Sequence, residues 1–174
     1  IVRDTAKRLG DTEAEGIYNE KYQTQLRRVR EEYFTATGRL VYDTVTAQTV
    51  ALHFGIVPQE FRPSLAQALN ENVKKHDYKM VTGFVGSPFV LFALADNGYF
   101  ETAEKVLFQN EFPGWLYEVD MGATTVWERW NSYTIEKGMA SSGMNSFNHY
   151  AYGCVCQWLW ETVAGICSDT ANPG

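Results

Sequence analysis

The sequence has few cysteines, and their spacing is not that of a metal site or a redox pair. Only three occur among 174 residues, at Cys154, Cys156 and Cys167. Three thiols cannot all pair with one another, and Cys154 and Cys156 are too close together for a CxxC motif. Histidines and carboxylates also lack the spacing of metal ligands. We therefore expect free, buried thiols, no metal site and no organic cofactor.

Long apolar runs and basic clusters are also missing. No stretch approaches the roughly 20 apolar residues that a membrane span requires. The formal net charge is −6, and the most basic run, residues 27–30, is followed at once by Glu31 and Glu32. This arrangement is typical of a solvated helix face. We expect neither nucleic acid nor a membrane as a partner.

Targeting signals are absent as well. The chain begins with Ile1 and shows no signal-peptide pattern and no Asn-x-Ser/Thr acceptor site. We expect the true N-terminus to lie upstream of Ile1. The compartment stays open between cytoplasmic and secreted.

Hydrophobic and aromatic residues are plentiful, at 45% and 14% of the chain. A chain of this length can bury a substantial core. The five tryptophans lie in the second half of the chain, at positions 115, 127, 130, 158 and 160. Flat aromatic faces suit both sugar rings and protein cores, so this enrichment alone does not choose between them.

A repeated helical pattern is visible along the chain. Helix-like runs end at Gly10, Gly55 and Gly98, which are 45 and 43 residues apart, and a fourth ends at Gly165, 67 residues further on. Glycine is common after a helix because that position often needs a left-handed backbone. The spacing predicts helical hairpins that form part of an open solenoid or of a closed ring.

Helical periodicity extends over most of the chain. Apolar residues recur every three to four positions in 12–34 and again in 58–76. Only residues 38–42 resemble a short extended piece. The sequence thus predicts an all-α fold of about three and a half hairpins. These are too few to close a six-hairpin ring, so we expect residues 1–174 to be a single segment of a larger protein.

The excess length of the last interval lies between Phe112 and Phe147. This stretch is rich in glycine and contains three of the five tryptophans. Long loops on a helical scaffold are where functional residues tend to lie. We therefore expect a functional loop at about 110–149.

Glu128 is the strongest catalytic candidate in this loop, because it stands between Trp127 and Arg129 with Trp130 beyond. Desolvation by the indoles and the charge of Arg129 would act on its pKa in opposite directions. Such a setting suits a general base. The alternative is a structural Glu–Arg pair at a helix start capped by Thr124 or Thr125.

Asn148 and His149 form a second candidate pair, just before the last helical run. A sugar ligand needs neutral donors and acceptors of this kind at the rim of a pocket. The alternative is that the polar residues here only cap the helix, through Asn145 or Ser146. We assign no role to His53 or His76.

Two segments of the loop carry a resemblance to a known family. ATTVWERW at 123–130 and GMNSFNHYAYG at 143–153 closely resemble bacterial and fungal α-L-rhamnosidases. Further matches are TAQTVALHFG at 46–55, TGFVGSP at 82–88 and DNG at 96–98. The resemblance covers essentially the whole chain.

The resemblance implies the C-terminal portion of an (α/α)6-barrel catalytic domain that releases terminal α-L-rhamnose with inversion. The general base maps to Glu128 and a sugar-contacting histidine to His149, while Trp115 matches a loop position near the sugar. We count Trp127, Arg129, Trp130 and Asn148 among the substrate-binding candidates.

The family's general acid belongs to an Asp/Glu-rich motif that has no counterpart in this chain. Asp43 and Asp96 match family positions but are interpreted as structural. We therefore expect the isolated chain to be inactive, with one wall of its pocket missing. The expected partners are a rhamnose-containing glycoside or polysaccharide and the remaining domains of the parent enzyme.

Two other functions fit the sequence. One is a six-hairpin glycosidase of different sugar specificity, which the NHYAYG motif argues against through resemblance. The other is a helical-repeat carbohydrate-binding module without catalysis. A Glu128 fully buried in a salt bridge would favour the binding module, whereas an open aromatic-lined concavity beside it would favour an enzyme.

Overall fold

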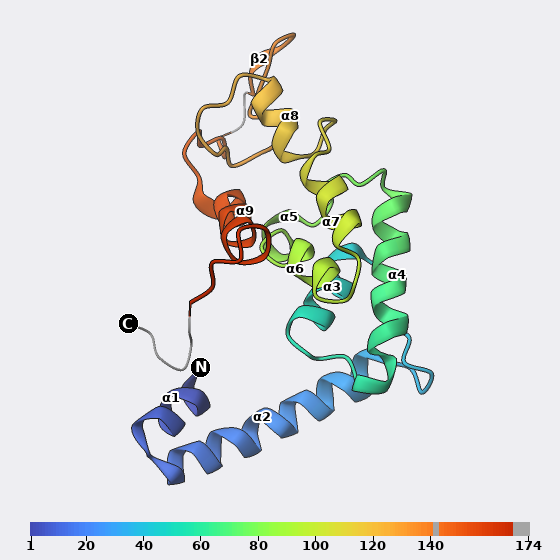
Figure 1. The fold of residues 1–174 in the computed structure, drawn as a ribbon, viewed down its shortest axis with the longest axis vertical. Coiled ribbons are helices and arrows are strands. Elements are labelled where there is room, and N and C mark those ends of the chain that lie inside the picture. The colour runs from blue at the N-terminus through green and yellow to red at the C-terminus, as the bar shows by residue number, and fades with distance from the viewer. Residues whose placement is uncertain (141–142, 169–174) are drawn as a thin grey trace.

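A computed structural model describes residues 1–140 and 143–168, and the chain is helical over most of this length (Figure 1). This confirms the all-α prediction. No helix in these residues is both long and apolar enough to cross a membrane. The α-helices are α1 Val2–Leu9, α2 Thr12–Tyr33, α3 Val45–His53, α4 Arg62–Lys75, α5 Gly83–Gly86, α6 Val90–Ala95, α7 Phe100–Leu107, α8 Trp115–Asp120 and α9 Val155–Trp158.

Helical hairpins form where the glycine spacing predicts them. Helices α1 and α2, α3 and α4, and α6 and α7 pack against each other in pairs. Gly10, Gly55 and Gly98 lie between the members of these pairs and have φ of 72°, 63° and 88°, and Gly165 ends the last helical run at 69°. Because other residues are strained at such angles, glycine is favoured at these turns.

The core lies between α3, α4, α6 and α7, in the middle of Figure 1. Helix α6 consists of VLFALA, and all of its residues except Ala95 are buried. Leu52 of α3, Leu69 of α4 and Leu94 of α6 are fully buried. A helix that is apolar on every side is stable in water only when its neighbours cover it, which explains the central place of α6.

Polar side chains fix the relative position of the second and third hairpins. Arg62, at the start of α4, donates to Asn97 Oδ1 at 2.8 Å and to the carbonyl of Leu52 at 3.0 Å. Thr102 of α7 donates to the buried Asn70 Oδ1 at 2.7 Å. The turn after α6 and the end of α3 are therefore joined through one guanidinium.

Helix α2 has no buried residue. It begins one residue after Asp11, whose side chain accepts from the N–H of Ala14, and it ends at Tyr33, one residue short of the predicted end. Its apolar positions Ile17, Tyr18 and Tyr22 are exposed. The amphipathic pattern is present in the helix, but α1, with the Arg3 guanidinium over the Tyr22 ring, covers its apolar face only in part.

The second predicted helix begins later than the sequence indicates. The predicted span 58–76 opens with a 3₁₀ turn, Gln59–Phe61, before α4. In the extended piece predicted at 38–42, Leu40 forms an isolated antiparallel bridge with Phe34.

The predicted functional loop contains regular structure. It includes α8 and a two-stranded hairpin, β1 Tyr133–Thr134 and β2 Gly138–Met139, in which Tyr133 pairs with Met139. This region lies at one end of the molecule, at the top of Figure 1. The chain therefore leaves the hairpin array at α7 and returns to it at α9.

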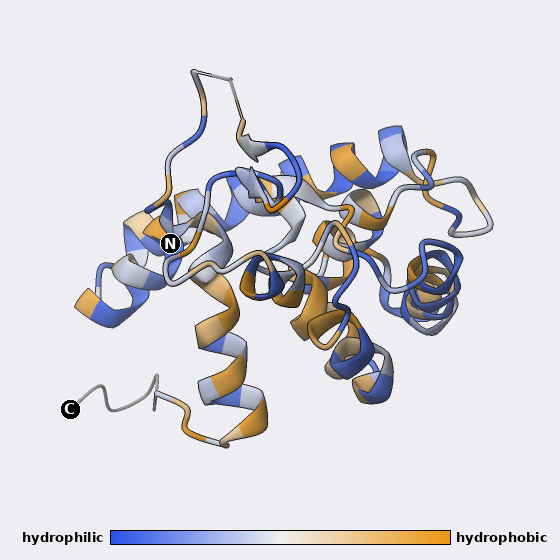
Figure 2. Cartoon of the chain, turned by 90° about the horizontal axis from the view of Figure 1, so that it is seen from above, coloured by the Kyte–Doolittle hydropathy of each residue, from blue (hydrophilic) through white to orange (hydrophobic). Residues whose placement is uncertain are grey.

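The last helical run leaves apolar residues exposed. It consists of a 3₁₀ helix, Tyr150–Cys154, then α9, then a π-helical turn, Leu159–Val163. Trp158 is buried and stacks on Phe100 of α7, whereas Trp160 on the same run is exposed. Figure 2 shows this helix, which leads to the C label, projecting from the rest of the chain with hydrophobic residues on it.

The three cysteines are free, as the sequence predicts, but their predicted burial is wrong. Cys156 and Cys167 are exposed and Cys154 is half-buried. Cys156 is exposed because α9 turns Trp158 toward α7, which leaves other positions of the run facing solvent. Cys167 lies beyond the last turn, after Gly165.

Candidate active site

Glu128 lies in an irregular segment between α8 and β1. Its backbone N–H donates to the carbonyl of Ser146 at 2.9 Å, and its Oε2 accepts from the N–H of Ser146, also at 2.9 Å. The side chain is half-buried. These reciprocal hydrogen bonds fix both the main chain and the carboxylate of Glu128 against one partner.

The structure corrects the expected helix start at Glu128. Residues 123–132 form no helix, and Thr125 caps none because its hydroxyl donates to the carbonyl of Phe147. Within residues 1–140 and 143–168, no salt bridge joins Glu128 to Arg129. The backbone of this segment bonds to residues 146–149, so it has no need of the bonds within a helix.

His149 caps the 3₁₀ helix Tyr150–Cys154. Its Nδ1 accepts from the N–H of Ala151 at 3.3 Å, so in the neutral ring Nε2 carries the proton and is a donor. The ring stacks on Phe84 at 5.0 Å between centroids, with 9° between the planes. His149 thus presents one N–H from a fixed ring.

The predicted caps Asn145 and Ser146 have other roles. The Asn145 amide donates to the carbonyls of Ser132 and Ala140, both at 3.2 Å, and so holds the β1–β2 hairpin. Ser146 holds Glu128 instead of a helix. A cap assignment from residue type alone was wrong here, because the helix begins three to four residues later than expected.

The two loop motifs lie side by side. Besides the Glu128–Ser146 pair, the N–H of His149 donates to the carbonyl of Val126 at 2.8 Å. Thr125 and Phe147 are joined by the hydroxyl bond described above. Tertiary structure thereby brings Glu128 and His149 onto adjacent, mutually bonded segments.

Three tryptophans singled out as sugar contacts are buried beneath these segments. Trp115, Trp127 and Trp130 expose 8%, 4% and 7% of their surface. The Trp115 indole N–H donates to the carbonyl of Tyr152 at 2.8 Å, and Trp130 stacks on the Tyr152 ring at 3.8 Å. Trp127 packs edge-on against Phe147. Trp115 and Trp130 also contact each other edge-on, so all three indoles are packed inside the protein.

Arg129 and Asn148 differ in exposure. Arg129 is half-buried, and its backbone N–H donates to the hydroxyl of Ser132 at 3.3 Å. Asn148 is exposed, and its backbone N–H donates to Ser146 Oγ at 3.2 Å. Asn148 is therefore accessible to solvent, and it precedes His149 in the chain.

Glu118 is a residue that sequence reasoning missed. It lies on α8 with 4% of its surface exposed, and its Oε1 has no hydrogen-bond partner among the described residues. Burial raises its pKa to about 7, and the nearby backbone of Trp127 opposes the rise. A signal was available, since Glu118 follows Trp115 by three residues and so shares the buried face of one helix turn.

Phe84 was missed as well. It is the second residue of α5, and 43% of its surface is exposed. Its ring packs against the rings of His149 and Tyr152. The TGFVGSP segment contained the signal, but only folding places it beside a residue 65 positions away. An exposed aromatic ring stacked on a fixed histidine ring is an arrangement that suits a sugar ring.

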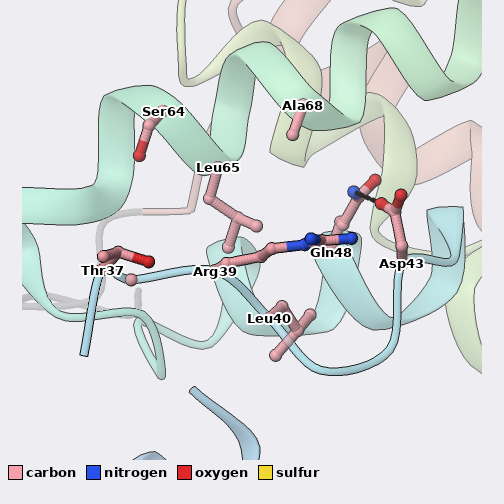
Figure 3. Close-up of a pocket in the computed structure, with 9 residues that line it drawn as sticks. Thr37, Arg39, Leu40, Asp43, Gln48, Ser64, Leu65 and Ala68 are labelled. Carbon is pink, nitrogen blue, oxygen red and sulfur yellow. Dashed lines mark hydrogen bonds between the residues drawn. The ribbon is translucent and has the colours of Figure 1, made fainter. Parts of the chain in front are cut away.

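Asp43 has a structural contact, in line with the interpretation from sequence. Its Oδ1 accepts from Gln48 Nε2 at 2.6 Å, at the start of α3. Figure 3 shows both residues with Arg39 at the side of a cavity of about 410 Å³, which Leu65 and Ala68 of α4 also line. Neither Glu128 nor His149 contributes to this cavity.

Within residues 1–140 and 143–168, no group of three or more His, Cys, Asp or Glu side chains is placed to hold a metal ion.

Comparison with known proteins relates the chain to one family. Residues 1–163 match the family model described as the bacterial alpha-L-rhamnosidase 6 hairpin glycosidase domain. Proteins named alpha-L-rhamnosidase from Formosa agariphila and Streptomyces avermitilis are 36% and 38% identical over 95% and 87% of the chain. The chain spans only 18% and 15% of those two proteins.

Solved structures agree with the sequence comparison. The crystal structure of native alpha-L-rhamnosidase from Aspergillus terreus matches with a TM-score of 0.88 and 33% identity, over 92% of this chain and 19% of that one. The Streptomyces avermitilis alpha-L-rhamnosidase complexed with L-rhamnose matches with a TM-score of 0.87 and 35% identity, over 94% of this chain and 16% of that one.

Proposed function

Because the chain belongs to the family of bacterial α-L-rhamnosidase six-hairpin glycosidase domains, we propose that it forms part of the catalytic domain of an enzyme that hydrolyses terminal α-L-rhamnosides. The chain spans less than one fifth of the length of these relatives. We propose that the rest of the barrel and further domains are supplied by the remainder of a longer polypeptide.

Glu128 is the proposed general base. The observation that carries this role is its fixed carboxylate, with Oε2 held by the N–H of Ser146 and the main chain held by the same residue. A carboxylate has further lone pairs with which to take a proton from water. In a reaction with inversion, the water lies between this base and a general acid whose carboxyl group is ~6.5–9.5 Å away. The proposed acid lies outside residues 1–174.

His149 and Asn148 are the proposed contacts to the sugar hydroxyls. The Nε2–H of His149 is fixed in direction because Nδ1 is occupied by the N–H of Ala151. Phe84 stacks on that ring and adds an exposed apolar face, which suits the C–H face of rhamnose. The complex with L-rhamnose reported for the Streptomyces avermitilis relative supports rhamnose as the sugar.

The burial of the tryptophans changes the role that we propose for them. Trp115, Trp127 and Trp130 have little surface left for a ligand, and the indole N–H of Trp115 is already donated within the chain. We assign them to the support of the loop. The half-buried Arg129 is assigned to the same support through Ser132.

The test is Glu128→Gln in the complete polypeptide, assayed on an aryl α-L-rhamnoside. Loss of a general base costs ~10²–10⁴-fold in rate, so we expect kcat to fall by that amount with KM little changed. Glu136→Gln is the matched control, because Glu136 is an exposed glutamate in the same loop. Circular dichroism checks the fold of each variant.

A loss below about tenfold for Glu128→Gln would reject the general base. The WERW segment would then be scaffolding, and a carbohydrate-binding module without catalysis would be the better description of this chain.

A further inference from the structure

Two of the segments that resemble the family, 46–55 and 82–88, supply no group to the proposed chemistry apart from Phe84. Phe84 lies on α5, a helix of only four residues. A single turn is not stable by itself, because most of its backbone groups lack partners within it. Phe84 and Val85 are 43% and 66% exposed, so neither anchors the turn by burial. Whatever holds α5 in place therefore also decides where the Phe84 ring lies.

Buried hydroxyl groups at both ends of α5 hold the turn together from within. Thr82 and Ser87 flank α5 and are 6% and 3% exposed. The Ser87 hydroxyl donates to the carbonyl of Gly83 at 2.6 Å. Because it has no second proton, Thr82 is the donor in the 3.0 Å bond between Thr82 Oγ1 and Ser87 Oγ. These two bonds close the turn but do not attach it to another helix.

Thr46 attaches the turn to α3. Its Oγ1, in the first turn of α3, donates to the carbonyl of Thr82 at 3.1 Å. The two helices approach closely, since a Cβ on Gly86 would lie 2.6 Å from Thr82 Cβ and 3.3 Å from Thr46 Oγ1. Glycine at position 86 therefore leaves the room that the Thr46 bond needs. Through this bond the second hairpin determines the position of α5.

The Phe84 ring helps to fix the imidazole of His149. The two rings are nearly parallel, with centroids 5.0 Å apart and 9° between the planes. The bond from the N–H of Ala151 to His149 Nδ1 is 3.3 Å long, against a usual length of about 2.9–3.0 Å, and it leaves the ring some freedom. Tyr150 is also parallel to the imidazole, but at 89% exposure it has few contacts that could hold it. Stacking on Phe84 is therefore what limits the direction of the His149 Nε2–H.

From these contacts we infer that Thr46 is a positioning residue for the sugar-binding site. It holds α5 through the Thr82 carbonyl, α5 places Phe84, and the Phe84 ring aligns His149. This inference rests on the proposed role of His149 as a donor to a sugar hydroxyl. In this role Thr46 acts through other residues and does not touch the sugar.

The test is Thr46→Val in the complete polypeptide, which removes the hydroxyl and keeps the shape of the side chain. A hydrogen bond to the sugar stabilises the bound substrate and the transition state alike. We therefore expect KM for an aryl α-L-rhamnoside to rise by about three- to tenfold, with kcat changed less than about twofold. Inhibition by L-rhamnose should weaken by the same factor as KM rises. Thr46→Ser restores the hydroxyl, and its KM should lie within about twofold of wild type.

Thr49→Val is the matched control. Thr49 lies on the same helix and is fully buried, and its hydroxyl has no hydrogen-bond partner among the described residues. The substitution removes the same group from the same helix without breaking a bond, so we expect wild-type KM and kcat. Partial unfolding lowers the apparent kcat and leaves KM unchanged, because it reduces only the amount of active enzyme. A rise in KM at constant kcat therefore distinguishes positioning from a loss of stability.

Three results would overturn the inference. The first is an unchanged KM in Thr46→Val, with or without a fall in kcat. The second is a KM in Thr46→Ser as high as that in Thr46→Val, because the hydroxyl would then not matter. The third is a further rise in KM when Thr46→Val is added to Phe84→Ala, since Thr46 has no effect once the ring that it places is gone.

His149→Asn tests the proposed function separately. Asparagine keeps an acceptor that can cap the 3₁₀ helix Tyr150–Cys154, but it lacks the Nε2–H. A wild-type KM in His149→Asn rejects His149 as a sugar contact and the inference with it. A raised KM in His149→Asn together with a wild-type KM in Thr46→Val rejects only the positioning role.

Discussion

Glu118 links stability to pH through a single side chain. Burial raises its pKa from an ordinary value of 4.5 to about 7. Between these two values the folded chain holds a proton that the unfolded chain has lost. The stability contributed by the protonated form is therefore fully present below pH 4.5 and is lost as the pH rises through about 7.

We expect Glu118→Gln to be stabilising at high pH. The amide keeps the acceptor but cannot ionise, so relative to wild type it should gain on the order of 2–3 kcal/mol at pH 8 compared with pH 4.5. The measurement is the melting temperature of both proteins at the two pH values. A Glu118→Gln shift that does not change with pH would show that Glu118 titrates normally.

Residue type alone predicted the structural role of some residues correctly and of others wrongly. Glycines at the ends of helical runs were confirmed, because a left-handed backbone excludes most other residues. The cap expected at Asn145 or Ser146 was wrong, because these side chains find partners in Ser132, Ala140 and Glu128, distant in sequence. Local preference decides a residue's role only where no tertiary partner competes for it.

At the scale of elements, Arg30 joins α2 to the second hairpin. Its Nε donates to the carbonyl of Ile56 at 2.7 Å. Its Nη2 donates to the carbonyls of Gly55 and Val57, at 3.3 and 3.4 Å. These carbonyls belong to the turn that follows α3, outside either helix. One guanidinium therefore satisfies three backbone acceptors in the turn between two helices.

Arg30→Ala should destabilise this junction. Hydrogen bonds to charged groups contribute ~1.5–3 kcal/mol, and we expect a loss in that range, seen as a lower melting temperature. The control is Arg27→Ala, since Arg27 is exposed on the same helix. Equal melting temperatures for the two variants would mean that water replaces Arg30 at these carbonyls without cost.

The loop that the sequence predicts to be functional shows where prediction of elements fails. We predicted it at about 110–149 from the interrupted repeat, and the irregular segment around Glu128 lies within these bounds. Neither the turn of α8 nor the β1–β2 hairpin was predicted, because each is too short to show a period. Their stability comes from cross-links such as Asn145 to the carbonyls beside the hairpin.

At the scale of the whole molecule, the described residues leave apolar surface uncovered, and two such faces stand out. One is the face of α2 with Ile17, Tyr18 and Tyr22, and the other is the last helical run with Trp160 and Val163. Large apolar residues gathered on exposed faces mark surfaces that bind other protein. This agrees with the proposal that other hairpins of a longer polypeptide complete the barrel.

We expect the isolated 174-residue chain to be inactive. It contains the proposed base, but the proposed general acid lies elsewhere, and hydrolysis with inversion needs both. The measurement is release of the aryl leaving group by the purified chain, beside the complete polypeptide at equal molar concentration. Turnover by the chain alone would contradict both the missing acid and the missing wall of the pocket.

The sequence by itself determined the class of fold and the hairpin spacing, and it named the segments that carry the candidate site. These features depend on local periodicity, on backbone conformation at glycine and on short motifs. Each of these signals involves only residues that are close together in the sequence. Tertiary structure alone decided that Glu128 is held by Ser146, that Trp115, Trp127 and Trp130 are buried and that Glu118 is buried with them. Such contacts join residues distant in sequence, and their strength depends on burial and direction, which no local pattern contains.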